Sequence, residues 1–211
     1  MVLWSSWQMD IMPHVAQCPA PLIEHELKRA AQLFFQQSRA WQVTLNPVSR
    51  LANDADVVVP MDSSDQELVR VESARWNGKP LEPRTADEMD QRFVDDWRDH
   101  SGTPEAYIQI TPGVMTLYPV PADAGTLTLR VSVRPSETAT GIPDDLAARF
   151  RDALATGAKS RLMLYQGKPW SAPDMGLALS AAFESNIDNA ASIAARAYGG
   201  GGRVASKPVW C

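Results

Sequence analysis

Apolar residues recur with helical spacing in three stretches of the chain. In PAPLIEHELKRAAQLFFQQSRAW, residues 19–41, one apolar stripe lies opposite charged residues and predicts an amphipathic helix. The stripe consists of Ile23, Leu27, Ala30, Phe34 and Trp41. A second stripe, in residues 142–165, consists of Ile142, Leu146, Phe150, Leu154, Ala158 and Leu162. The third, in residues 171–198, consists of Met175, Leu179, Phe183, Ile187, Ala191, Ala194 and Tyr198, with Ser171 as the expected cap.

Between about Val43 and Arg134 the apolar period falls to two, which predicts strands. Asn77-Gly78 follows ELVRVESARW, and Pro112-Gly113 separates AYIQI from VMTLYP, so both pairs predict hairpin turns. The clearest strand is TLTLRVSVR. Its packed side is expected to hold Leu127, Leu129, Val131 and Val133, and its wet side Thr126, Thr128, Arg130, Ser132 and Arg134.

One predicted helix interrupts the strands, in TADEMDQRFVDDWRDH, residues 85–100. Its apolar side consists of Met89, Phe93 and Trp97, at steps of four. Its outer face is strongly acidic and consists of Asp87, Glu88, Asp90, Asp95, Asp96 and Asp99.

The predicted fold class is α+β. Amphipathic helices are not stable alone in water, so we expect a bundle of three main helices, one N-terminal and two C-terminal, with an inserted antiparallel β-rich domain and an extended C-terminal tail. The predicted parts are residues 1–42 for the N-terminal segment and first bundle helix, 43–135 for the inserted β-rich domain, 136–198 for the two-helix hairpin that completes the bundle, and 199–211 for the tail. Small residues dominate the last helix, so we expect it to pack closely against a neighbour.

The tail, which ends in GGGGRVASKPVWC, joins four glycines to an apolar tip. Glycines predict a flexible spacer, whereas the tip gains most from burial. We therefore predict an anchor for a partner protein, with a frayed end as the alternative. The anchor residues are Gly199, Gly200, Gly201, Gly202, Arg203, Lys207, Pro208, Val209 and Trp210.

Charge separates this tail from the rest of the chain. The net charge of the protein is −5, which argues against general nucleic-acid binding. Arg203 and Lys207 give the tail +2, so the remaining residues carry −7. The two cysteines, Cys18 and Cys211, lack a zinc or redox spacing and are expected to be free thiols.

A search for catalytic motifs finds no nucleophile elbow, zinc helix or phosphate loop in the sequence. His14, His25 and His100 occur in no pattern that acid–base or metal chemistry requires, so no cofactor, metal or catalytic residue is predicted. The acidic stretch 87–99 is interpreted as a solvated face. Its alternatives are a paired-carboxylate hydrolase, with Asp95 and Asp96 as candidates, and a surface past which DNA slides without sticking.

The most distinctive loop is QGKPWSAPD, residues 166–174, at a tight link between two helices. Lys168 and Trp170 flank a proline there. Trp170 either closes the end of the helical hairpin, or both residues contact a partner.

Three stretches of this chain resemble the head-to-tail adaptor (connector) proteins of tailed bacteriophages. They are residues 13–42, residues 74–83 (ARWNGKPLEP) and residues 141–197, where helix, GKPW loop and second helix occur in the family's order and lengths. The resemblance spans the chain from about residue 13 onward and rests on pattern and overall plan.

This resemblance implies a structural protein of the virion, made and assembled in the host cytoplasm. Its partners would be the portal protein, a tail nozzle or tail completion protein, and further copies of itself in a ring, commonly of twelve. Such a ring extends the channel through which genomic DNA passes without sequence-specific binding. The C-terminal extension would anchor to the portal, and no membrane is involved.

Two further hypotheses come from other classes of protein. One is a tail-associated peptidoglycan hydrolase that uses the acidic stretch, and the other is a host- or sugar-binding β-module mounted on the helices. Trp4 and Trp7, near the start of the chain, either contact neighbouring subunits or pack on their own bundle.

Overall fold

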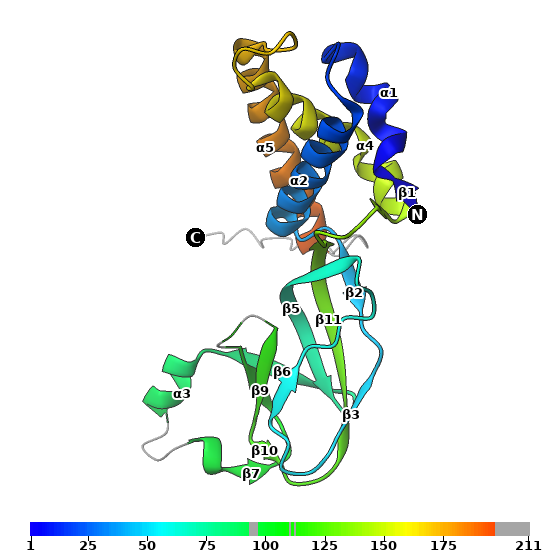
Figure 1. Ribbon diagram of the computed structural model, residues 1–211. Coiled ribbons are helices and arrows are strands. Elements are labelled where there is room, and N and C mark those ends of the chain that lie inside the picture. The colour runs from blue at the N-terminus through cyan, green and yellow to red at the C-terminus, as the bar shows by residue number, and fades with distance from the viewer. Residues whose placement is uncertain (93–96, 110, 112, 197–211) are drawn as a thin grey trace, which may run out of the picture. The chain divides into compact units, whose positions relative to one another are not determined.

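The computed structural model describes residues 1–92, 97–109, 111 and 113–196, with Arg92 described by its backbone alone. These residues form two compact units (Figure 1). The helical unit comprises Trp4–Ala40 and the chain from Asp144 onward, and the β-unit comprises Met1–Leu3 and Trp41–Pro143.

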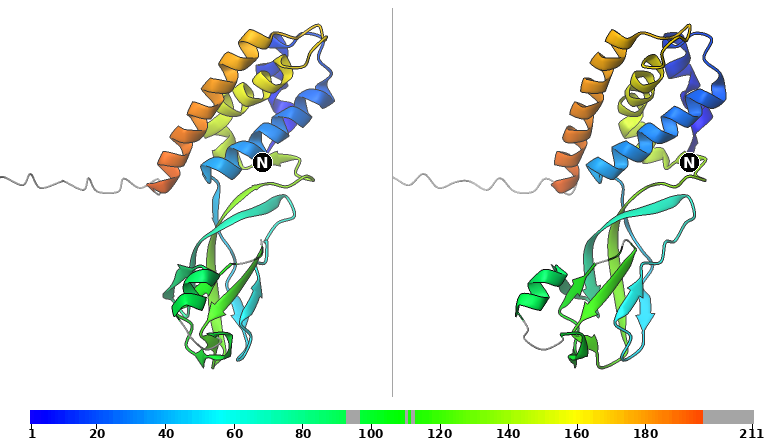
Figure 2. Two further views of the ribbon diagram at one scale, coloured as in Figure 1. Left: turned by 90° about the vertical axis from the view of Figure 1, so that its left-hand side faces the viewer. Right: turned by 60° about the vertical axis from the view of Figure 1, so that its left-hand side comes forward.

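Three long helices form the body of the helical unit. They are α2 (Ala20–Ser38), α4 (Asp144–Met163) and α5 (Pro173–Ala195). Short elements precede them, namely η1 (Trp4–Trp7), α1 (Gln8–Ile11) and η2 (Met12–His14). Figure 2 shows the long helices side by side, which confirms the predicted bundle.

The core of the bundle centres on Phe34 of α2, where all three long helices meet. Its ring centroid lies 5.0 Å from that of Phe150 on α4 and 6.1 Å from that of Phe183 on α5. Phe35 adds an edge-on contact at 5.3 Å from Phe34. These four rings are buried and account for much of the apolar area that the bundle removes from water.

Helices α4 and α5 pack closely at two glycines. A Cβ atom added to Gly157 of α4 would lie 2.6 Å from the Phe183 ring, and one on Gly176 of α5 would lie 3.2 Å from the carbonyl oxygen of Ser160. The expected close packing of α5 against a neighbour is therefore seen against α4.

Two expected members of the helical stripes lie outside the helices. Helix α2 ends at Ser38 because Arg39 adopts a left-handed φ of 52°, so Trp41 is buried in the β-unit instead. Ile142 precedes α4 and belongs to the short strand β12 (Gly141–Ile142), where it pairs with Val2 of β1 (Val2–Leu3).

The start of α5 also differs from the prediction. Ser171 is not the cap, because the N-cap is Ala172, whose N–H donates to the carbonyl oxygen of Met163 on α4. Met175 is 54% exposed, since the buried side of α5 runs through Gly176 and Phe183.

Trp4 and Trp7 pack on their own helical unit, 5% and 0% exposed. The Arg151 guanidinium of α4 lies 5.1 Å from the Trp7 ring centroid and donates to Asp10 Oδ2 at 2.8 Å. Of the two interpretations of these tryptophans, packing is confirmed, and exposure to a neighbouring subunit is wrong because both are buried.

The β-unit is built on one eight-stranded sheet, in the order β2-β11-β5-β6-β8-β9-β4, with β3 also paired to β11 (Figure 1). Its strands are β2 (Gln42–Thr44), β3 (Val48–Arg50), β4 (Asp56–Val58), β5 (Gln66–Trp76), β6 (Lys79–Arg84), β8 (Ala106–Ile108), β9 (Val114–Tyr118) and β11 (Gly125–Pro135). Two shorter strands, β7 (Ser101–Gly102) and β10 (Val120–Pro121), pair with each other.

The α+β fold class is confirmed, and the sheet is mixed rather than wholly antiparallel. Strand β6 runs parallel to β8, and β7 runs parallel to β10. A helical segment connects β6 to β8, and such a crossover is what parallel pairing requires.

Both predicted hairpins are present. Strands β5 and β6 join through Asn77 and Gly78, whose φ angles of 47° and 81° suit a two-residue turn. Strands β8 and β9 pair antiparallel before and after Gly113, whose φ is 80°, while Pro112 lies outside the described residues.

Strand β11 confirms its predicted packed side, since Leu127, Leu129, Val131 and Val133 are at most 1% exposed. The predicted wet side is wrong at Ser132, which is 0% exposed and donates to the carbonyl oxygen of Arg70 at 3.4 Å. The pairing of β11 with β5 shifts register on both sides of Ser132, so strict alternation does not apply there.

The single helix predicted over residues 85–100 is divided. Helix α3 covers Ala86–Arg92, and the 3-10 turn η3 covers Trp97–Asp99. Met89 of α3 and Trp97 of η3 are buried together against Ile108 of β8. Phe93, Asp95 and Asp96 lie outside the described residues.

None of the described helices combines the length and apolar character that crossing a membrane requires.

The close approach at Gly157 gives a test of the bundle. We expect Gly157→Ala to lower the free energy of unfolding by about 2 kcal/mol, because overpacking against the enclosed Phe183 ring outweighs alanine's better helix propensity. Thermal or urea unfolding measures it. Thr156→Ala, at the neighbouring half-exposed position, is the control and should change stability little. A Gly157→Ala protein as stable as the wild type would contradict the close packing.

Candidate functional site

The predicted anchor, Gly199 to Gly202 with Arg203, Lys207, Pro208, Val209 and Trp210, lies outside the described residues. The candidate surfaces that the structure does describe are the loop between α4 and α5, a charged cluster in the helical unit, and a cavity in the β-unit.

The loop that contains Lys168 and Trp170 is a compact turn. Gly167 adopts a left-handed φ of 70°, and the Ser171 N–H donates to the carbonyl oxygen of Lys168 at 3.0 Å. Lys168 is exposed and Trp170 is half-buried, with an indole Nε1 that has no hydrogen-bond partner within the described parts of the chain. The loop therefore carries one exposed cation and one half-buried indole at the end of the helical hairpin.

A buried carboxylate, which the sequence did not single out, ties α2 to α4. Glu26 is 1% exposed, and its carboxylate accepts hydrogen bonds from Arg161 Nε at 2.6 Å and Tyr165 OH at 2.9 Å. Arg29 Nη1 lies 3.6 Å from the same carboxylate, and His25 Nε2 lies 3.9 Å from it.

The neighbours of Glu26 decide its protonation. Burial by itself raises the pKa of the carboxyl, but the hydrogen bonds from Arg161 and Tyr165 and the charges of Arg161 and Arg29 outweigh it, so the pKa lies below its usual range. The hydrogen bond between Tyr165 and Glu26 raises the pKa of the Tyr165 phenol, and burial raises it further. Glu26 is therefore an anion at neutral pH, and Tyr165 remains a hydrogen-bond donor.

The sequence did contain a signal for this cluster. Glu26 occupies a core-facing position of the first helical stripe, between Ile23 and Leu27, where an acid is rarely buried without a partner. Arg161 and Tyr165 are four residues apart, a spacing that predicts that both lie on the same face of the second predicted helix. A shallow hollow of about 310 Å³, also lined by Leu164, opens over the cluster.

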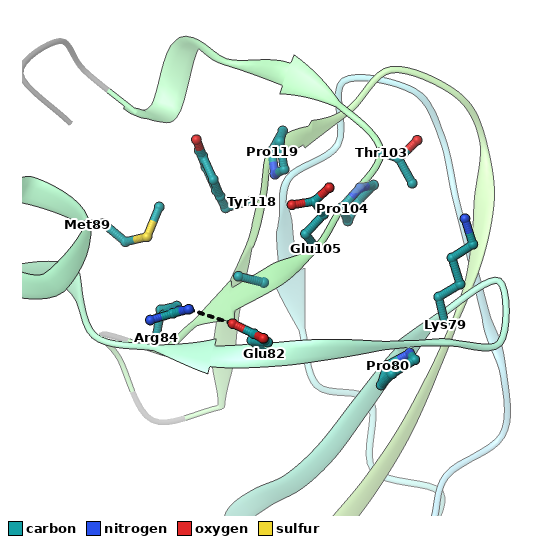
Figure 3. Close-up of a pocket in the computed structure, with 11 residues that line it drawn as sticks. Lys79, Pro80, Glu82, Arg84, Met89, Thr103, Pro104, Glu105, Tyr118 and Pro119 are labelled. Atoms are coloured by element: carbon teal, nitrogen blue, oxygen red, sulfur yellow. Dashed lines mark hydrogen bonds and ion pairs between the residues drawn. The ribbon is translucent and has the colours of Figure 1, made fainter. Parts of the chain in front are cut away.

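A cavity of about 840 Å³ lies in the β-unit beside β6 (Figure 3). Its charged residues are Lys79, Glu82, Arg84 and Glu105, and Glu82 forms an ion pair with Arg84. Met89 and Tyr118 line the other side. The described residues around this cavity include no His, Cys or Ser, and among them no hydrogen bond joins the Thr103 hydroxyl to a base.

The acidic residues that the structure describes have exposed side chains, as the solvated-face interpretation predicts. They are Asp87, Glu88, Asp90 and Asp99. Asp90 accepts a hydrogen bond from Trp97 Nε1 at 2.7 Å, and Glu88 forms a capping box with Thr85, so both have structural partners. The described residues contain no group of three or more His, Cys, Asp or Glu able to hold a metal ion.

The histidines and the described cysteine have no arrangement of a catalytic kind. His14 and His100 are exposed, and His25 is exposed beside Glu26. Cys18 is a buried free thiol, and burial raises its pKa, which makes it less reactive. Cys211 lies outside the described residues.

Replacing the buried carboxylate tests the cluster. We expect Glu26→Gln to lower the free energy of unfolding by about 2 kcal/mol at neutral pH, because two hydrogen bonds to a charged group are weakened. The pKa of Glu26 is lower in the folded than in the unfolded chain, so its stabilisation is lost as the pH falls from the usual range of a Glu carboxyl through the lowered value. The difference between wild type and variant should then shrink.

Urea unfolding of both proteins across this pH range measures the effect. Glu184→Gln, at an exposed position of α5, is the control and should match the wild type throughout. A Glu26→Gln difference that stays constant into acid would show that the charge of Glu26 contributes nothing.

Comparison with known proteins supplies one match. The family model described as SU10 adaptor protein matches residues 22–205, which is most of the chain. No curated protein matches this sequence significantly.

Proposed function

From the premise that the chain belongs to the SU10 adaptor protein family, and so is a phage head-tail adaptor, we propose that its copies form a ring of twelve beneath the portal. The ring extends the DNA channel and offers the docking surface for a tail nozzle or tail completion protein. The match over residues 22–205 carries this proposal, because it includes the bundle, the β-unit and the first part of the tail.

Adaptors of this family are structural proteins, not enzymes. This overturns the peptidoglycan-hydrolase alternative for Asp95, Asp96 and the rest of the acidic stretch. The host- or sugar-binding hypothesis predicted aromatic side chains on exposed strand positions, whereas the exposed positions of β11 are Thr126 and Arg130.

The distribution of charge supports passage of DNA without tight binding. Residues 41–143, which make up most of the β-unit, carry nine Lys and Arg against sixteen Asp and Glu, a net charge of −7. Such a unit repels phosphates at long range. Genomic DNA therefore moves past it without sequence-specific contacts.

The portal anchor is the tail, residues 199–211, with Val209 and Trp210 buried in a pocket of the portal and Arg203 and Lys207 beside acidic groups there. A flexible spacer lets each copy reach its site, and many copies in a ring multiply modest individual affinities. Lys168 and Trp170 form a second contact, with a neighbouring subunit or the tail protein. The protein is thus a component of the virion, made and assembled in the host cytoplasm.

Removing the tail tests the anchor. We expect a chain lacking residues 199–211 to fold but to bind isolated portals at least tenfold more weakly, and Trp210→Ala to account for much of the loss, since a buried aromatic anchor contributes about 2 kcal/mol. Titration of portals with labelled adaptor measures this, and particle images count the copies. Ser206→Ala in the same tail is the control. Wild-type affinity of the truncated chain would refute the anchor.

The contact role of the loop has its own test. We expect Lys168→Ala and Trp170→Ala to reduce the fraction of portal particles that carry a complete ring, while the adjacent exposed position, changed by Gln166→Ala, has no effect. Thermal unfolding is measured in parallel. If Trp170→Ala lowers the melting temperature and leaves ring formation unchanged, the indole only closes the helical hairpin.

A further inference from the structure

The outer face of β2, β11 and β5 is a polar surface that the adaptor role leaves unexplained. Strand pairing sets Arg130 opposite Ser73 and Thr44, and Thr128 opposite Arg75. These side chains alternate with the buried leucines and valines of β11, so they point away from the core. This is the side of β11 that the sequence predicted to be wet.

Two arginines on this face form no ion pair within the described residues, whereas four other arginines of the β-unit do. Arg50 pairs with Asp54, Arg84 with Glu82, Arg98 with Asp90, and Arg134 with Glu67. Arg75 and Arg130 have no acidic partner among the described residues, although Arg75 donates to the carbonyl oxygen of Gly78 at 3.4 Å. Both are exposed.

The two arginines border one hollow of about 340 Å³. Thr44, Ser73 and Thr128 add three hydroxyl groups to its lining, which also includes Pro80. A guanidinium is suited to bind carboxylates, and hydroxyls add neutral donors beside it. The hollow is therefore a site for one or two carboxylate side chains.

The same unit carries a surface of opposite charge, away from this hollow. Asp87 and Glu88 on α3 and Asp99 on η3 are exposed. Met89 and Trp97 hold these elements against Ile108 of β8, whereas the hollow lies over β2, β11 and β5. Within the described residues, no ion pair joins Arg75 or Arg130 to these acids, so both surfaces of one copy are available to other molecules.

We propose that the hollow of one copy receives the acidic α3–η3 surface of a second copy. Because the two surfaces differ, the contact is head-to-tail, which is the type that closes into a ring. It rests on the proposed ring and assigns to the β-unit a direct part in holding neighbouring copies together. The net charge of −7 in the β-unit disfavours DNA as the occupant, although arginine and hydroxyl groups also suit phosphate.

Charge reversal and its rescue test the contact in the full chain. Arg75→Glu with Arg130→Glu, and separately Asp87→Lys with Asp99→Lys, should each lower the fraction of portals with complete rings at least tenfold. A chain that carries all four changes restores the attraction with its sign inverted and should assemble within about threefold of the wild type, since opposite charges attract equally in either orientation. Mass photometry and particle images of adaptor–portal mixtures measure ring completion.

A control variant has the same change in net charge at two positions outside the proposed contact. Asp123→Lys with Asp152→Lys alters the net charge as much as the Asp87 and Asp99 pair, at exposed positions outside both surfaces, and should assemble like the wild type. Thermal unfolding verifies that each variant is folded. If the protein with Arg75→Glu and Arg130→Glu does not fold, the experiment uses Arg75→Gln with Arg130→Gln instead.

The outcomes separate this contact from the proposed function. A wild type that forms no ring on portals refutes the ring itself. Complete rings with either double reversal, or no recovery with all four changes, overturn the contact while the ring stands. If reversal at Arg75 and Arg130 instead abolishes binding of a labelled DNA duplex and leaves rings intact, the hollow binds phosphate and the proposal is wrong.

Discussion

The buried carboxylate of Glu26 joins two parts of the helical unit that lie far apart in the sequence. A charge that is 1% exposed is tolerated only when hydrogen bonds and opposite charges replace its water, and Arg161 of α4 and Tyr165, just after α4, do so. The partners are 135 and 139 residues away along the chain. Between them lies the entire stretch Trp41–Pro143 of the β-unit, so this polar contact, together with the rings around Phe34, holds the bundle closed across a large insertion.

Sequence periodicity predicted most of the architecture because burial follows it closely. The stripes through Phe34, Phe150 and Phe183 and the alternation along β11 correspond to buried side chains. Two of the errors occur where backbone geometry departs from the regular period: at the left-handed Arg39, which removes Trp41 from its helix, and at the register shifts around Ser132. Periodicity describes regular elements and carries no information about where they are interrupted.

The candidate site was less predictable, for a different physical reason. Glu26 and its partners come from parts of the helical unit that are far apart in sequence, so their contact depends on the packed bundle. The outer hollow likewise depends on the register that sets Arg130 beside Ser73 and Thr128 beside Arg75. By contrast, Lys168 and Trp170 could be proposed from the sequence because their loop is local, and family resemblance identified the adaptor role without reference to any single contact.

The pairing of β1 with β12 decides how the start of the chain connects the two units. The chain passes between the two units after Leu3, after Ala40 and after Pro143, so three covalent connections join them. The first of these transmits tension only as long as Val2 and Leu3 remain paired with Ile142 and Gly141. A Cβ atom on Gly141 would lie 2.1 Å from the carbonyl oxygen of Val2, so a glycine there is what allows the pairing. This connection is therefore only as strong as the hydrogen bonds of a two-residue strand.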